Sequence, residues 1–99
     1  MQEQIVKSSY ASFQHGAIRS EGKLFVTESE VSFEPFGKEF SLGPYKLSRQ
    51  SIAKVEQCKG MAGGIMPITS DAIRITLLNN DTYEFILANP EQWIDCLSH

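Results

Sequence analysis

Apolar and polar residues alternate with a period of two along much of the chain, as expected for β-strands with one buried face. The pattern is clearest in residues 72–78 (AIRITLL) and 82–87 (TYEFIL). One face of these segments carries apolar side chains: Ile73, Ile75 and Leu77 in the first, and Tyr83, Phe85 and Leu87 in the second. Between them, Asn79-Asn80-Asp81 has turn chemistry, because Asn and Asp tolerate positive φ. The pattern predicts a β-hairpin.

The first half of the chain shows a weaker form of the same alternation. Residues 5–13 predict a strand, or a short helix leading into one, with a continuation at 16–20 and a turn at 20–22 (SEG). Further strands are predicted at 23–27 (KLFVT), 31–36 (VSFEPF), 45–47 and 51–58, with a loop at 37–44. Pro35 restricts the end of its strand to a sheet edge or a bulge.

The C-terminal segment 90–97 (PEQWIDCL) has the period of a helix. Asn89 is predicted to be the N-cap, Pro90 fits the first helical position, and Gln92 stands three residues after the cap. One stripe of this helix is apolar and consists of Trp93, Ile94 and Leu97. Because so short a helix is not stable alone in water, the stripe is expected to dock on the sheet.

The stretch 59–71 (KGMAGGIMPITSD) matches neither pattern and predicts a long inter-strand loop. Burying its four large apolar side chains would contribute about 6–12 kcal/mol. Ordering its backbone costs about 1–2 kcal/mol for each residue, and glycines lose the most freedom. The apolar side chains therefore need a receiving surface. That surface belongs to the core of this chain, to a partner or second copy, or to a membrane.

Several fragments resemble one protein family. These are GKLFVTESEVSF (22–33), KLSRQSIAKVE (46–56), IRITLLNNDTYEFIL (73–87) and PEQWIDCL (90–97). In order and spacing they resemble the GRAM branch of the pleckstrin-homology superfold. The resemblance implies one domain over residues 1–99, mainly β, with an antiparallel barrel or sandwich of about seven strands capped by one C-terminal α-helix. It also implies a non-catalytic module that binds phosphoinositide-type lipids, membranes or proteins.

Charge and hydropathy limit the classes of partner. The net charge is −3, and residues 51–99 hold three Lys/Arg against six Asp/Glu. This balance argues against nucleic acid, which requires a basic face. No run of about 18 apolar residues predicts a transmembrane segment. The first ten residues do not follow a signal-peptide pattern, so we expect a cytoplasmic protein, with peripheral membrane association as an alternative.

Residues with catalytic or metal-binding chemistry are sparse. The pairs Cys58–His15 and Cys96–His99 are the candidate thiol–imidazole combinations, and neither has a recognisable motif around it. The two Cys and two His lack metal-ligand spacing, and the glycines do not follow a phosphate-binding pattern. We therefore predict no catalytic residues, no metal and no cofactor. In a reducing compartment both thiols are expected to be free.

The candidate binding residues come from two places. The resemblance implies a basic headgroup pocket in the loop between the first two strands, where Arg19 and Lys23 flank Glu21, with Lys38 and Lys46 on the rim. The stretch 59–71 adds apolar side chains. The hypothetical protein- or lipid-binding set is Arg19, Lys23, Lys38, Met61, Ile65 and Met66. Two alternatives remain: the charges are simply solvated, or the chain is a homodimer subunit that pairs through a strand edge or through residues 59–71.

Overall fold

The computed structural model describes residues 4–15, 18–37, 43–62 and 66–98, with the side chains of 62 and 66–68 left aside. It contains seven strands, a short 3-10 turn at Arg49–Ser51 and one α-helix. The strands are β1 (Lys7–His15), β2 (Ile18–Val26), β3 (Glu30–Pro35), β4 (Tyr45–Ser48), β5 (Ile52–Ala62), β6 (Met66–Leu77) and β7 (Thr82–Leu87). The helix α1 spans Pro90–Leu97.

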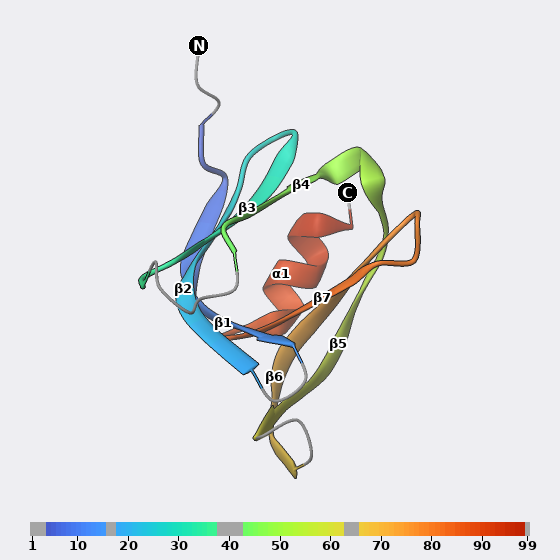
Figure 1. Ribbon diagram of the computed structural model, residues 1–99. Helices are drawn as coiled ribbons and strands as arrows, with labels where there is room; N and C mark the ends of the chain where they lie inside the picture. The colour runs from blue at the N-terminus through green and yellow to red at the C-terminus, as the bar shows by residue number, and fades with distance from the viewer. Residues whose placement is uncertain (1–3, 16–17, 38–42, 63–65, 99) are drawn as a thin grey trace.

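All seven strands form one antiparallel sheet in the order β4-β3-β2-β1-β7-β6-β5. The sheet curls around α1, with β1–β4 on one side of the helix and β5–β7 on the other (Figure 1). β5 and β6 extend together beyond the rest of the sheet. The predicted fold class is confirmed: the chain is mainly β, with a pleckstrin-homology-like curled sheet and a single C-terminal helix in the described residues.

The core forms where the apolar faces of the strands meet the helix. Phe13, Phe33 and Phe85 pack at its centre, with ring centroids 5.3–6.0 Å apart. Trp93 and Leu97 of α1 are buried against the sheet, and Ile94 packs partly against the same cluster. The predicted docking of the helix stripe is therefore confirmed. Burial of these large side chains is the main stabilising contribution to the fold.

The predicted turn at residues 20–22 is wrong, because these residues lie inside β2. Gly22 pairs with Ala11 on one side and with Pro35 on the other. A Cβ atom at Gly22 would lie 2.7 Å from the Cα atom of Pro35 and still closer to the carbonyl oxygen of Glu34. This glycine therefore permits close approach of two strands, which the sequence signal for a turn did not distinguish from chain reversal.

The predicted loop at 59–71 is also wrong for most of its length. β5 continues through Ala62 and β6 begins at Met66, so that residues 63–65 alone lie outside the described strands. The β5–β6 register shifts on both sides of Gly60, as in a β-bulge. The bulge accommodates the glycine without ending the strand. The glycine and proline content of this stretch therefore marks an irregular hairpin.

The helix begins where predicted, with Asn89 as its N-cap, but the Asn89 side chain does not cap it. Asn89 has φ 56° and ψ 56°, a left-handed conformation, and its side chain makes no capping hydrogen bond. Its carbonyl oxygen instead accepts hydrogen bonds from the N–H groups of Gln92 and Trp93. Asn tolerates this left-handed conformation better than most residues, which explains its presence here.

Candidate functional site

One face of the sheet points away from the core, and we call it the outer face. On β1 it carries Tyr10, Ser12 and Gln14, which alternate with core-facing residues. The β1–β2 register places these beside three residues of β2, in the order Lys23, Glu21 and Arg19. Arg19 and Lys23 were predicted to lie in a loop, but both lie in β2, with Arg19 near its start and Lys23 further along. The β2 strand begins at Ile18, so both cations are held on a rigid surface.

Hydrogen bonds of the Gln14 side chain connect the C-terminal end of β5 to this outer face. Gln14 is 6% exposed. Its Nε2 atom donates hydrogen bonds to the carbonyl oxygen of Lys59 at 3.0 Å and to Oε1 of Glu84 at 2.8 Å. Its Oε1 atom accepts a hydrogen bond from the backbone N–H of Met61 at 2.9 Å. One amide side chain therefore satisfies backbone groups on both sides of Gly60.

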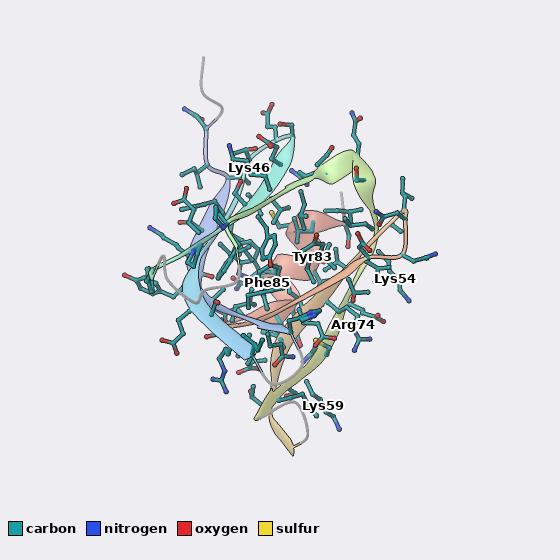
Figure 2. The ribbon with its side chains drawn as sticks, in the orientation of Figure 1. Lys46, Lys54, Lys59, Arg74, Tyr83 and Phe85 are labelled. Carbon is teal, nitrogen blue, oxygen red and sulfur yellow. The ribbon has the colours of Figure 1, made fainter. Side chains whose placement is uncertain are left out.

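Beyond Gln14, a network of ion pairs connects β7, β6 and β5. Nε of Arg74 lies 2.8 Å from Oε2 of Glu84, and Nη1 of Arg74 lies 3.4 Å from Oε1 of Glu56. Arg74 and Lys54 lie on the β5–β6 side of the molecule, with Lys59 near the far end of β5 (Figure 2). These half-exposed pairs connect β5, β6 and β7 and, because solvent screens them, contribute little to stability.

The backbone around Gly60 packs directly on β7. A Cβ atom at Gly60 would meet Cγ2 of Thr69 at 2.7 Å and Cδ1 of Ile86 at 2.8 Å. Ile86 is on the outer face, because it alternates with core-facing Phe85 and Leu87 and pairs with Ser12. The end of β5 therefore covers the outer face of β7. This contact gives part of the stretch 59–71 the receiving surface that its composition requires, within this chain.

Beside the covered region lies a shallow depression of about 270 Å³, which we call the outer groove. Its lining residues are Tyr10, Ala11, Ser12, Glu21, Gly22, Phe36 and Ile86. Tyr10 is 74% exposed and Phe36 is 63% exposed. Their rings are in edge-to-face contact, with centroids 5.8 Å apart. The N–H of Phe36 donates a hydrogen bond to the carbonyl oxygen of Glu21, which fixes this ring next to the groove.

The structure brings three of the predicted binding residues to the surroundings of this groove. Lys23 is the cross-strand neighbour of Tyr10, and Arg19 is the neighbour of Gln14. Met61 is half-buried, and its N–H is bound to Gln14. Lys38 and Ile65 lie outside the described residues, as does the side chain of Met66. Lys46, proposed for the rim, lies on β4 on the other side of the molecule from Lys54 and Arg74 (Figure 2).

Sequence reasoning missed Tyr10, Phe36 and Gln14. A signal was present for Tyr10, because it lies out of phase with Ala11 and Phe13, which both face the core. An aromatic side chain in the polar phase of a strand indicates an exposed ring. Phe36 gave the same signal, because it is out of phase with the buried Val31 and Phe33. Gln14 gave none, because its burial depends on its contacts with the distant end of β5.

The thiol of the Cys58–His15 candidate pair is not activated, and His99 of the Cys96–His99 pair lies outside the described residues. Both cysteines are free thiols. Burial and the nearby carboxylates of Glu84 and Glu56 raise the pKa of the Cys58 thiol from 9.0 to about 11, although Arg74 opposes this change. A nucleophilic thiol requires the opposite change, towards a lower pKa. Among the described residues, no group of three or more His, Cys, Asp or Glu side chains is arranged to hold a metal ion.

Comparisons with known proteins identify a fold and no family. No family model and no curated protein matches the chain. A solved structure, the C-terminal domain of an unknown protein from Leishmania infantum, is similar with a TM-score of 0.76 and 18% sequence identity. The match covers 96% of this chain and 81% of that one. At this identity the similarity supports the fold alone. Within the part of the chain that is described, no helix is long and apolar enough to cross a bilayer.

Proposed function

We propose that this protein is a non-catalytic binding module that receives a protein partner at the outer groove. The observation that carries the proposal is the exposed Tyr10–Phe36 pair, two large rings in mutual contact on the surface of a rigid sheet. Aromatic side chains in contact with water are unfavourable unless something covers them, and they dominate the energetics of protein interfaces. From the sequence resemblance alone, we also propose that the module belongs to the GRAM branch of the pleckstrin-homology superfold.

The charges around the groove favour a protein over an anionic membrane. Arg19 and Lys23 lie on the same strand face as Glu21, and Glu34 is the β3 neighbour of Lys23. A polar rim with charges of both signs around an aromatic centre is typical of protein interfaces. Binding to anionic lipid requires a cluster of cations without intervening carboxylates. Peripheral membrane association is therefore the second candidate, and the test separates the two.

The experiment selects ligands on the wild-type chain and compares matched variants. A phage-displayed random peptide library is enriched on the immobilised protein, and the enriched peptides are titrated against Tyr10→Ser, Phe36→Ser and Leu78→Ser. Leu78 is 70% exposed and lies beside the β6–β7 turn, outside the groove, so Leu78→Ser controls for loss of an exposed apolar side chain. We expect Tyr10→Ser and Phe36→Ser to weaken binding at least about tenfold, with Leu78→Ser unchanged.

Three results would contradict the proposed protein-binding function. Equal binding of all variants would place the peptide site elsewhere. Failure of any peptide to enrich, together with retention on phosphatidylserine–phosphatidylcholine vesicles, would assign the groove to lipid. The sheet also has two edge strands, β4 and β5, which supports a homodimeric subunit as the remaining alternative. Sedimentation showing a concentration-dependent dimer that Phe36→Ser abolishes would assign the groove to a second copy of the chain.

A further inference from the structure

A second recess lies at the C-terminal end of β1, whereas the N-terminal end of this strand lies near the helix. Lys7 begins β1, and its Nζ atom lies 5.3 Å from the ring centroid of Trp93, whereas the recess lies around His15 at the other end of the strand. Its volume is about 390 Å³, within the range of sites for small molecules. The lining residues are Phe13, His15, Tyr45, Asn80, Asp81, Thr82 and Tyr83. None of these belongs to the outer groove.

The walls of this recess are aromatic rings held by the core. The ring centroids of Phe13 and Tyr45 are 5.0 Å apart, and those of Tyr45 and Tyr83 are 5.4 Å apart. The planes of both pairs are inclined, at 59° and 64°, so the rings do not stack face to face. Phe13 is buried, while Tyr45 and Tyr83 are half-buried and pack against the core. Their positions are therefore fixed before any ligand arrives.

The polar side of the recess is formed by the β6–β7 turn. The backbone N–H of Asp81 donates to Oδ1 of Asn79, and Oδ2 of Asp81 accepts a hydrogen bond from Nδ2 of Asn79 at 3.2 Å. The carbonyl oxygen of Asp81 accepts a hydrogen bond from the N–H of Leu77. The turn thus holds an exposed carboxylate at the recess. Among the described lining residues, Asp81 is the one acid, there is no Lys or Arg, and His15 is the one basic side chain.

We propose that this recess binds a small organic cation carrying methylated nitrogen, such as a quaternary ammonium group. The ring faces of Tyr and Phe carry negative electrostatic potential and attract cations. The free-energy cost of desolvation is smaller for a methylated ammonium than for a bare ammonium, because the methylated ion is more weakly hydrated. The Asp81 carboxylate adds a favourable charge at the opening of the recess. A phosphate or carboxylate ligand would be repelled by the Asp81 carboxylate. The proposal goes beyond the proposed protein-binding function and does not depend on it.

The test uses two probes with the same shape and different charge. Choline and its neutral isostere 3,3-dimethylbutan-1-ol are titrated into the whole chain, and the NMR resonances of the Tyr45 and Tyr83 rings are followed. We expect choline to shift both resonances in a saturable way, with an affinity about fivefold or more above that of the alcohol. Equal affinity of the two probes would overturn the proposal, because the recess would then recognise shape and apolar surface without charge. Absence of saturable shifts with choline would overturn it as well.

Two variants test the role of Asp81 without disturbing the aromatic walls. Asp81→Asn keeps the turn chemistry and removes the charge, and Asp95→Asn removes an exposed charge on α1 as the matched control. We expect Asp81→Asn to weaken choline binding about threefold or more, with Asp95→Asn at wild-type affinity and both variants melting like wild type. Equal choline affinity of Asp81→Asn and Asp95→Asn would contradict the proposed charge recognition.

Discussion

Gln14 of β1 and Glu84 of β7 are cross-strand neighbours, and the side-chain amide of Gln14 donates to the Glu84 carboxylate at 2.8 Å. The other oxygen of Glu84 accepts from Arg74 of β6. Because Gln14 also binds the backbone of β5 at Lys59 and Met61, four strands are connected through the side chains of Gln14, Glu84 and Arg74. These side chains therefore position the end of the β5–β6 hairpin next to the outer groove.

Replacing Gln14 with Leu tests this connection. The substitution approximately conserves volume but leaves the carbonyl of Lys59 and the N–H of Met61 without their hydrogen-bond partner. Since unsatisfied buried polar groups lose solvation without compensation, we expect the free energy of unfolding to fall by about 2–4 kcal/mol. Urea denaturation followed by far-UV circular dichroism measures this change.

Gln57→Leu is the matched control for that prediction. Gln57 is exposed, and its Nε2 atom donates a single hydrogen bond to the carbonyl oxygen of Ser70 at 2.8 Å. Water replaces that partner, so the expected loss of stability is below about 1 kcal/mol. Similar losses in Gln14→Leu and Gln57→Leu would show that the buried connection makes no special contribution.

Much of the fold could be predicted from the sequence because its core follows simple periodicities. The alternation in β7 and in the second half of β6 reports directly which side chains face the core: Phe85 and Ile73 are buried as their phase requires. The apolar stripe of the helix could also be predicted, since Trp93 and Leu97 are four residues apart and therefore lie on one face. Local sequence determines these features, and no distant contact overrides them.

The parts that failed depend on contacts between distant segments. Gly60 has the composition signal of a loop, yet it lies in β5, where the contact with Ile86 leaves no room for a side chain. Gly22 has the composition signal of a turn, yet it lies in β2, where close approach of Pro35 requires a residue without a side chain. The basic residues predicted to line a loop pocket, Arg19 and Lys23, therefore lie on the surface of β2. The Tyr10–Phe36 pair could not be predicted, because it brings together residues from β1 and from the segment after β3.

The two strand glycines should differ in their tolerance of a methyl group. At Gly22 an added Cβ meets backbone atoms of Glu34 and Pro35, which cannot move without separating β2 from β3. At Gly60 it meets the ends of the side chains of Thr69 and Ile86, which have other rotamers. We expect Gly22→Ala to lower the free energy of unfolding by more than about 3 kcal/mol, and Gly60→Ala by about 1–3 kcal/mol. Urea denaturation of both variants gives the comparison.

A double-variant cycle checks the physical cause at Gly60. Shortening the neighbour with Ile86→Ala removes the two side-chain atoms that an alanine at position 60 would approach at 2.8 Å. The loss caused by Gly60→Ala should therefore shrink by about 1 kcal/mol or more in the Ile86→Ala background. Strict additivity of the two substitutions would show that the Ile86 contact does not require this glycine, which leaves the contact with Cγ2 of Thr69 at 2.7 Å as the cause.

Cys58 should react slowly in the folded protein. Burial, followed by the effect of Glu84, raises the pKa of its thiol from 9.0 to about 11, which lowers the thiolate fraction at pH 8 by up to about 100-fold. In a Cys96→Ser chain, where Cys58 is the remaining thiol, iodoacetamide should modify the native protein far more slowly than the urea-unfolded protein. Equal rates in the two states would contradict the raised pKa.

The same pKa predicts an alkaline loss of stability. Below pH 9 the thiol is protonated in both the folded and unfolded states, so the raised pKa has no effect on the difference between them. Between pH 9 and about 11 the unfolded thiol releases its proton while the folded thiol retains it, so the unfolded state is favoured as pH rises. After allowance for solvent around this half-buried group, we expect a loss of about 1 kcal/mol over that range.

Comparing Cys96→Ser with Cys58→Ala/Cys96→Ser at pH 8 and pH 10.5 isolates this effect, because the other groups that titrate are common to both chains. The difference in their stabilities should change with pH in favour of the chain that lacks Cys58, and a difference independent of pH would refute the linkage.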